Sequence, residues 1–208
     1  MKKPRENFIM HFKNNIRKYI IASSFLFVGI ILGALWGIDS QKSSHNGNIL
    51  NSFLSVYKLT GITSNEMFLK SMMSNIRPLI LLWISGFSIY LIPINLCTCS
   101  IKGFGIGYTI SYFTSEGGIY GLFFSFINLF FQNIIYIPAM LIYSVIQINY
   151  VMNIKKANSI QSGYKQIKKL KINNFVFFII GIIICVLCAI VETGVVPALI
   201  KLIYGNIA

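Results

Sequence analysis

The chain has 208 residues, of which 55% are hydrophobic and only 11% charged, and this composition excludes an ordinary soluble globular protein. Its 18 lysines and arginines against five acids give a formal net charge of +13, which in a soluble chain would suggest nucleic acid binding. Here the cations cluster between long apolar segments, as in the cytoplasmic loops of membrane proteins. The sequence therefore predicts an integral membrane protein whose partners include membrane lipids and no nucleic acid.

The first apolar segment extends from Tyr19 to Gly37, after a basic tail at residues 1–18 that we expect to be cytoplasmic. A helix needs about 20 residues to cross a hydrocarbon core about 30 Å thick. This segment is too long for the apolar part of a signal peptide, and no small-residue cleavage motif follows it. We therefore interpret it as an uncleaved anchor.

Residues 38–77 form the predicted external loop, which we expect to be partly helical. Ile49 and Phe53, and later Phe68 and Met72, lie at helical spacing in this loop. An amphipathic segment on the outer membrane surface, or one offered to a partner, would have this pattern. A loop packed on its own protein would have it too, and the sequence leaves both interpretations open.

Four further apolar segments follow, and we predict that each crosses the membrane. They are Pro78–Ser100, Gly103–Ser115, Gly118–Ile148 and Ile172–Tyr204. We expect helix bends at the prolines inside these segments, which are Pro93, Pro138 and Pro197.

Glycines at four-residue spacing predict close packing between helices, because each set falls on one helix face and lets backbones approach. The first set lies in the anchor and two pairs lie later in the chain; they are Gly29, Gly33 and Gly37, Gly103 and Gly107, and Gly117 and Gly121. The spacing fits packing within one chain and packing between copies in a homo-oligomer equally well.

The basic segment at residues 149–171 decides the predicted topology, since it contains six lysines and no acid and should be cytoplasmic. An even number of crossings must then separate it from the cytoplasmic N-terminus. We therefore count Gly103–Ser115 as a crossing, although it is short. The fold class is an all-α membrane protein, a bundle of about five transmembrane helices in a single polytopic domain over residues 1–208, with an external C-terminus.

The sequence contains few groups that could carry chemistry. Neither His11 nor His45 has metal-ligand spacing, and no nucleotide-binding or nucleophile motif occurs, so we predict no metal, no cofactor and no enzymatic activity. Four cysteines occur as two close pairs, Cys97 with Cys99 and Cys185 with Cys188. The second pair lies in an apolar helix and could be an intramembrane redox pair or two small buried residues.

Glu192 is a carboxylate inside the last apolar segment, where it costs several kcal/mol unless it is neutral or paired. Our hypothesis is a polar cluster that locks the helix bundle, made by Glu192, Arg77, Gln132 and Asn133, with Pro197 bending the helix beyond it. The alternative is that Glu192 reaches the outer headgroups by itself.

The layout of the whole chain resembles the stage II sporulation protein M family of endospore-forming bacteria. The similarity is carried by Lys102-Gly103-Phe104, Gly107-Tyr108, Gly118 to Gly121, Phe131-Gln132-Asn133, Ile137-Pro138-Ala139 and the Glu192 to Pro197 spacing. The wider family often has His-Gly followed by Glu at Gln132-Asn133, and this difference fits the sporulation branch.

The resemblance implies a non-catalytic membrane scaffold. Such proteins recruit two peptidoglycan-degrading proteins, stage II sporulation proteins D and P, to the septum, where thinning of the wall drives the mother-cell membrane around the forespore. Two other classes stay open. A small transporter or permease subunit would explain prolines and polar residues at membrane depth, and a thiol oxidoreductase would use Cys185 and Cys188.

Overall fold

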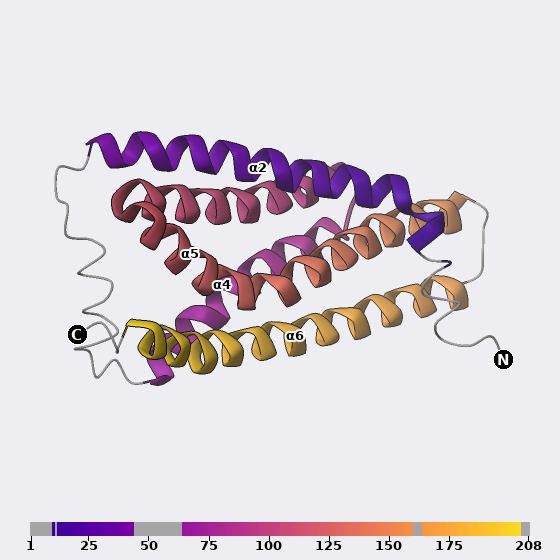
Figure 1. The fold of residues 1–208 in the computed structure, drawn as a ribbon. Helices are drawn as coiled ribbons and strands as arrows, with labels where there is room; N and C mark the ends of the chain where they lie inside the picture. Colours follow the sequence, from indigo (N-terminus) through magenta and orange to yellow (C-terminus); the bar gives the residue numbers. More distant parts are fainter. Residues whose placement is uncertain (1–9, 11, 44–63, 160–163, 205–208) are drawn as a thin grey trace.

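The computed structural model describes residues 10, 12–43, 64–159 and 164–204, and in this part of the chain every regular element is helical (Figure 1). The elements are α2 (Ile16–Ser43), α4 (Ser64–Ser85), the short 3-10 helix η1 (Ile89–Leu91), α5 (Ile92–Ser159) and α6 (Tyr164–Tyr204). The predicted all-α class is therefore confirmed. In Figure 1, α2 and α6 lie on opposite sides of the bundle, with α4 and α5 between them.

By length and apolar composition, the described chain has four helices that could cross a membrane, whereas the sequence predicted about five. These candidate spans are Ile16–Ser40, Ile89–Ser115, Asn133–Ala157 and Gln166–Gly194. The predicted boundaries of two apolar segments in the middle of the chain differ from the helix boundaries in the structure. Each difference has a local physical cause.

The first error is the segment Pro78–Ser100, which is not one helix. Its first part ends α4 at Ser85, and the chain then turns through Gly86, Phe87 and Ser88 into η1 and α5. The backbone N–H groups of Gly86 and Phe87 bond carbonyls three residues earlier, which tightens the end of α4. A hydropathy average does not detect this reversal, because the turn itself is made of apolar and small residues.

The second error concerns Gly103–Ser115, which is no separate crossing because it continues the helix begun at Ile92. The real reversal comes at Gly118, whose φ of 57° and ψ of −134° interrupt the helical backbone of α5. Glycine adopts this backbone without steric cost, whereas an L side chain would be strained there. We call residues 92–117 and 119–159 the first and second halves of α5.

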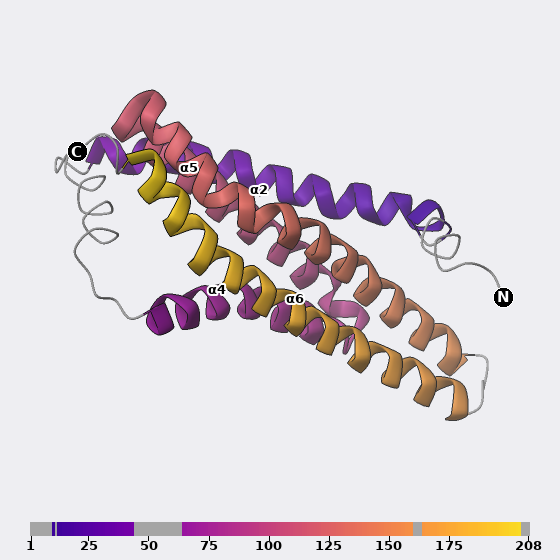
Figure 2. The same ribbon diagram turned by 60° about the horizontal axis from the view of Figure 1, so that its bottom comes forward.

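Both views show this reversal at the same end of the molecule as the end of α6 (Figures 1 and 2). We call it the Gly118 end. At the opposite end, which we call the Lys18 end, the start of α2 meets the second half of α5, where the Lys18 ammonium donates to the amide oxygen of Asn149. The start of α6 lies at the Lys18 end as well (Figure 1).

α4 is the most polar long helix, and one face of it packs against α5 and α6. Part of it was predicted as the external loop, but Ser71 and Asn75 are buried. Leu79 lies against Gly181, and the Trp83 ring stacks on Phe178 at 4.9 Å between centroids, so α4 and α6 are antiparallel. This outcome favours the loop packed on its own protein for residues 64–77. The apolar residues Ile49 and Phe53 lie outside the described residues.

The basic segment predicted at residues 149–171 is mostly helical, since α5 continues to Ser159 and α6 begins at Tyr164. Among the described residues, cations are frequent at the Lys18 end. They include Lys13, Arg17, Lys18, Lys155, Lys156, Lys168, Lys169 and Lys171.

Candidate functional site

The candidate site is a polar cluster centred on Asn75, a fully buried residue of α4. Its side-chain oxygen accepts a hydrogen bond from the Lys102 ammonium at 3.2 Å. Its backbone carbonyl accepts from the Tyr136 hydroxyl at 2.8 Å and from the Cys185 thiol at 3.5 Å. One residue of α4 is therefore joined to both halves of α5 and to α6.

Pro78 lies inside α4, three residues after Asn75. A proline inside a helix donates no hydrogen bond to the carbonyl four residues earlier, here that of Ser74, and its ring crowds the same turn. The Asn75 carbonyl belongs to this turn and accepts from side chains of two other helix segments. Side chains of neighbouring helices compensate for prolines in membrane helices in this way.

Lys102 of α5 lies between Tyr136 of the second half of α5 and Glu192 of α6. It lies midway along the candidate span Ile89–Ser115, where an ammonium group needs a partner. Its nitrogen lies 4.5 Å from the centre of the Tyr136 ring, an arrangement in which the ring face attracts the cation. Lys102 also interacts electrostatically with Glu192, whose carboxylate accepts a hydrogen bond from the Ser71 hydroxyl of α4. We call Ser71, Asn75, Lys102, Tyr136 and Glu192 the Lys102 cluster.

Three of the four residues of the predicted polar cluster divide between two places. Glu192 is in the Lys102 cluster. Arg77 and Asn133 lie instead in a pocket of about 620 Å³ between α4 and α5, and Lys102 lines the same pocket. Asn133 is buried and donates to the Leu129 carbonyl at 2.9 Å. The side chain of Gln132 lies outside the described residues.

The glycines predicted to allow close packing lie where α2 and the first half of α5 run parallel. A methyl group added to Gly29 or Gly33 would overlap the backbone of Ser100 or Phe104. Methyl groups added to Gly103 and Gly107 would overlap the α2 carbonyls of Leu26 and Ile30 in the same way.

Three further predicted glycines lie nearer the Gly118 end. Gly37 approaches the carbonyl of Tyr108, and a methyl group on Gly121 would overlap the Phe113 carbonyl across the α5 reversal. The packing described here is within one chain. Gly117 is in α5, but its surroundings are outside what the structure describes.

The three predicted bend prolines have different positions. Pro93 is the second residue of α5, in the first turn, where a proline does not interrupt the hydrogen bonds. Pro138 lies inside the second half of α5 and Pro197 inside α6. The non-helical backbone found within α5 is at Gly118, which was not among the predicted bend residues.

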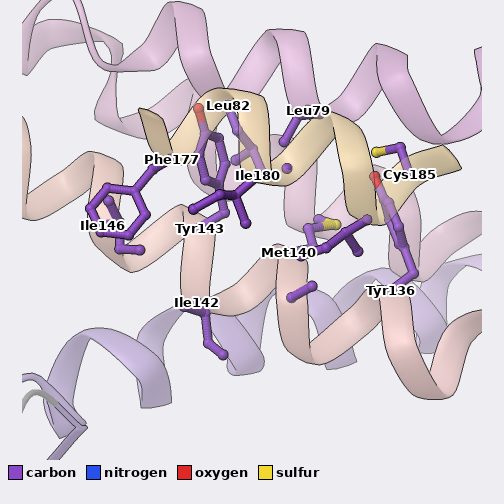
Figure 3. A pocket seen from close by; sticks show the side chains of 13 residues that line it. Leu79, Leu82, Tyr136, Met140, Ile142, Tyr143, Ile146, Phe177, Ile180 and Cys185 are labelled. Carbon is purple, nitrogen blue, oxygen red and sulfur yellow. The ribbon is translucent and has the colours of Figure 1, made fainter. Parts of the chain in front are cut away.

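The cysteines are free thiols, and Cys185 and Cys188 are buried. Cys185 and Tyr136 also line an apolar cavity of about 300 Å³ between α4, α5 and α6 (Figure 3). The other labelled side chains around this cavity are mostly aliphatic or aromatic. Its lining suits hydrocarbon, and we assign it no chemistry.

A second polar group lies toward the Lys18 end. The Ser144 hydroxyl donates to the side-chain oxygen of Asn95, whose amide nitrogen donates to Ser85 at 3.1 Å. Nearby, Gln147 donates to Asn174 at 2.7 Å, which joins α5 to α6. These neutral side chains join helices inside the bundle, and the Gln147 side-chain oxygen accepts no hydrogen bond from the described residues.

Within the part of the chain that the structure describes, no three His, Cys, Asp or Glu side chains come close enough to hold a metal ion. The candidate site joins four helix segments around one half-buried cation, Lys102, and it opens beside that cation into a pocket.

The family model described as stage II sporulation protein M matches residues 22–197. This chain belongs to the stage II sporulation protein M family. The match begins in α2, ends in α6 and contains the whole Lys102 cluster. The family assignment makes the chain a sporulation-related membrane protein. Comparison with curated proteins and with solved structures gave no match.

Sequence reasoning missed most of the Lys102 cluster in this stage II sporulation protein M family member. Hydropathy places Lys102 at the end of a span, although a lone cation between two apolar runs indicates a polar group inside the membrane. Ser71 and Asn75 fell in the predicted external loop, so nothing marked them as bundle residues. Tyr136 has no distinguishing pattern, because aromatic residues are frequent throughout the chain.

Proposed function

We propose that this protein is a non-catalytic membrane scaffold that recruits and localises septal peptidoglycan hydrolases for forespore engulfment. The observation that carries the proposal is the family match over residues 22–197. By the resemblance of the chain to this family, the partners are stage II sporulation proteins D and P, and the place of action is the mother-cell membrane at the septum.

The exposed helix faces support a role in binding partner helices. Large apolar side chains on α2 are more than half exposed, with 63% for Phe27, 59% for Ile31 and 61% for Leu35. α6 has a similar face that includes Ile183 and Leu187, at 54% and 53%. In a membrane such faces contact lipid tails or the transmembrane segments of other proteins, with which they associate by van der Waals packing.

The charge distribution supports an orientation for the scaffold. Cations of the described residues are frequent at the Lys18 end, which is the pattern of the cytoplasmic side. The Gly118 end then faces the space that contains the wall. In this orientation the ends of the helices near Gly118 and Glu192 are available to the extracytoplasmic domains of partners.

Deletion of the gene in the native endospore-forming bacterium tests the proposal. Imaging of stained membranes and of fluorescently tagged D and P proteins should show normal vegetative growth, arrested engulfment and dispersed partners. Expression of the intact chain from a second locus should restore both. Normal engulfment with normally placed partners would contradict the scaffold role, and a defect in vegetative growth would favour a housekeeping transporter.

A further inference from the structure

We propose that the pocket between α4 and α5 binds an anionic phospholipid whose headgroup carries hydroxyl groups, of the phosphatidylglycerol type. This inference concerns a binding site of the chain itself and stands independently of the hydrolase partners. We call it the cationic pocket. Its described lining is Lys70, Met73, Ser74, Arg77, Pro78, Leu81, Thr98, Ile101, Lys102, Gly105, Ile106, Thr109, Leu129 and Asn133.

The first argument is charge. Three cationic side chains, Lys70 and Arg77 of α4 and Lys102 of α5, line this one pocket. None of the described residues lining it is acidic. Glu192 balances part of this charge, because it interacts with Lys102. The pocket nevertheless keeps an excess of positive charge beside a hydrocarbon phase, where a phosphate group is a strong partner for arginine and lysine.

The second argument is an unsatisfied acceptor. Asn133 is only 7% exposed, and its side-chain oxygen accepts no hydrogen bond from the described residues. Its amide nitrogen is already bonded to the Leu129 carbonyl. A buried amide oxygen without a donor costs about 1–3 kcal/mol, so this atom indicates a ligand that brings a hydroxyl or amine donor into the pocket.

The two threonines of the pocket add acceptors of the same kind. Thr98 donates its hydroxyl proton to the Ile94 carbonyl at 2.7 Å, and Thr109 donates to the Gly105 carbonyl at 2.8 Å. Their oxygen lone pairs remain available to a ligand. The pocket thus combines cations with neutral acceptor oxygens, which matches a phosphodiester joined to a glycerol headgroup.

The third argument is the surroundings. The volume of about 620 Å³ is in the range of small-molecule sites, roughly 300–1,000 Å³. The apolar residues of its wall are turned outward, with exposures of 54% for Met73 and 64% for Ile101. The pocket extends from Lys102, midway along an apolar span, toward the Gly118 end, where Lys70 and Thr109 line it. A ligand here is held by its polar part while acyl chains lie on the apolar surface, and this favours a membrane lipid over a soluble anion.

Native mass spectrometry of the purified full-length protein in detergent tests the inference. The protein is titrated with phosphatidylglycerol, with zwitterionic phosphatidylethanolamine, and with phosphatidylmethanol, an anionic phosphodiester without headgroup hydroxyls. We expect one phosphatidylglycerol to be retained about tenfold more strongly than phosphatidylethanolamine, with phosphatidylmethanol between them, because charge and hydroxyl donors contribute separately.

The matched variants are Arg77→Gln in the cationic pocket and Arg17→Gln at the Lys18 end, both at exposed arginines. Arg77→Gln should lower phosphatidylglycerol retention about tenfold with unchanged thermal stability, and Arg17→Gln should leave retention unchanged. Equal retention of the three lipids, or equal loss in both variants, would overturn the proposal. Displacement of the lipid by excess inorganic phosphate would assign the pocket to a soluble anion and would also overturn it.

Discussion

At the scale of single residues, the structure depends on how one lysine inside an apolar span is accommodated. Lys102 is held by the Asn75 amide oxygen at 3.2 Å and by the Tyr136 ring at 4.5 Å, and it interacts with Glu192. Each contact comes from a different helix segment. A cation in this position therefore determines which helices must be neighbours, because an unpartnered ammonium at membrane depth costs more than most packing errors.

Glu192→Gln tests this residue-scale role. The variant keeps the size of the side chain but removes its charge, so the Ser71 hydroxyl loses a carboxylate acceptor and Lys102 loses the electrostatic attraction of an acid. We expect the protein to lose about 1–3 kcal/mol of stability, measured as a lower thermal unfolding temperature in detergent.

The double variant Glu192→Gln with Lys102→Met is the control, because it removes both charges and should be less destabilised than the sum of the two single variants. Unchanged abundance, folding and activity of Glu192→Gln would show that this carboxylate does not lock the bundle.

At the scale of elements, the pairing of α2 with the first half of α5 depends on glycine. Gly29 and Gly33 of α2 face the α5 backbone, and Gly103 and Gly107 of α5 face the α2 backbone. With small residues on both faces the two backbones come into contact, which is the main source of attraction between helices in lipid. The exposed large side chains of α2 lie on the rest of its circumference.

Gly33→Ala tests the contact between these two helices. The added methyl group would overlap the Phe104 carbonyl, a backbone atom that cannot move aside alone, so we expect a loss of about 1–3 kcal/mol. Thermal unfolding in detergent measures it.

Gly105→Ala is the matched control, since nothing lies within 4 Å of the position of its methyl group. It should be neutral or slightly stabilising, because alanine favours a helix by about 1 kcal/mol over glycine. Equal stability of the two variants would show that the helix contact is looser than described.

At the scale of the whole molecule, charge and packing point to one orientation. The start of α2, the end of α5 and the start of α6 share the Lys18 end with many of the described cations. The Lys102 cluster lies away from these cations, in the part of the bundle nearer the Gly118 end. A cytoplasmic Lys18 end therefore places the cationic pocket toward the outer leaflet.

Cysteine labelling in intact cells tests this orientation. Single cysteines are introduced at Ser162, between Lys156 and Lys168, and at Ile119, which is 64% exposed beside the reversal of α5. The native cysteines are replaced by alanine. A membrane-impermeant maleimide should label Ile119→Cys and leave Ser162→Cys unlabelled until the cells are permeabilised. Ready labelling of Ser162→Cys would invert the orientation and remove the wall-facing scaffold.

Sequence alone determined the class of this protein, the family it resembles and the apolar character of most of its helices, because these follow from composition and from runs of residues along the chain. It also marked the glycine positions in α2 and α5 by their spacing. It misplaced the boundaries between Pro78 and Ser115, because hydropathy averages over a turn of small apolar residues. Only the tertiary structure decided where the chain reverses.

The Lys102 cluster likewise depended on the tertiary structure. Ser71 and Glu192 are 121 positions apart, and Asn75 and Cys185 are 110 apart, so no local pattern relates them. The sequence showed polar side chains at membrane depth, where an unpaired polar group is energetically unfavourable. It did not show which of these side chains form hydrogen bonds with one another. That choice depends on the antiparallel packing of α4 on α6, which brings these distant side chains together.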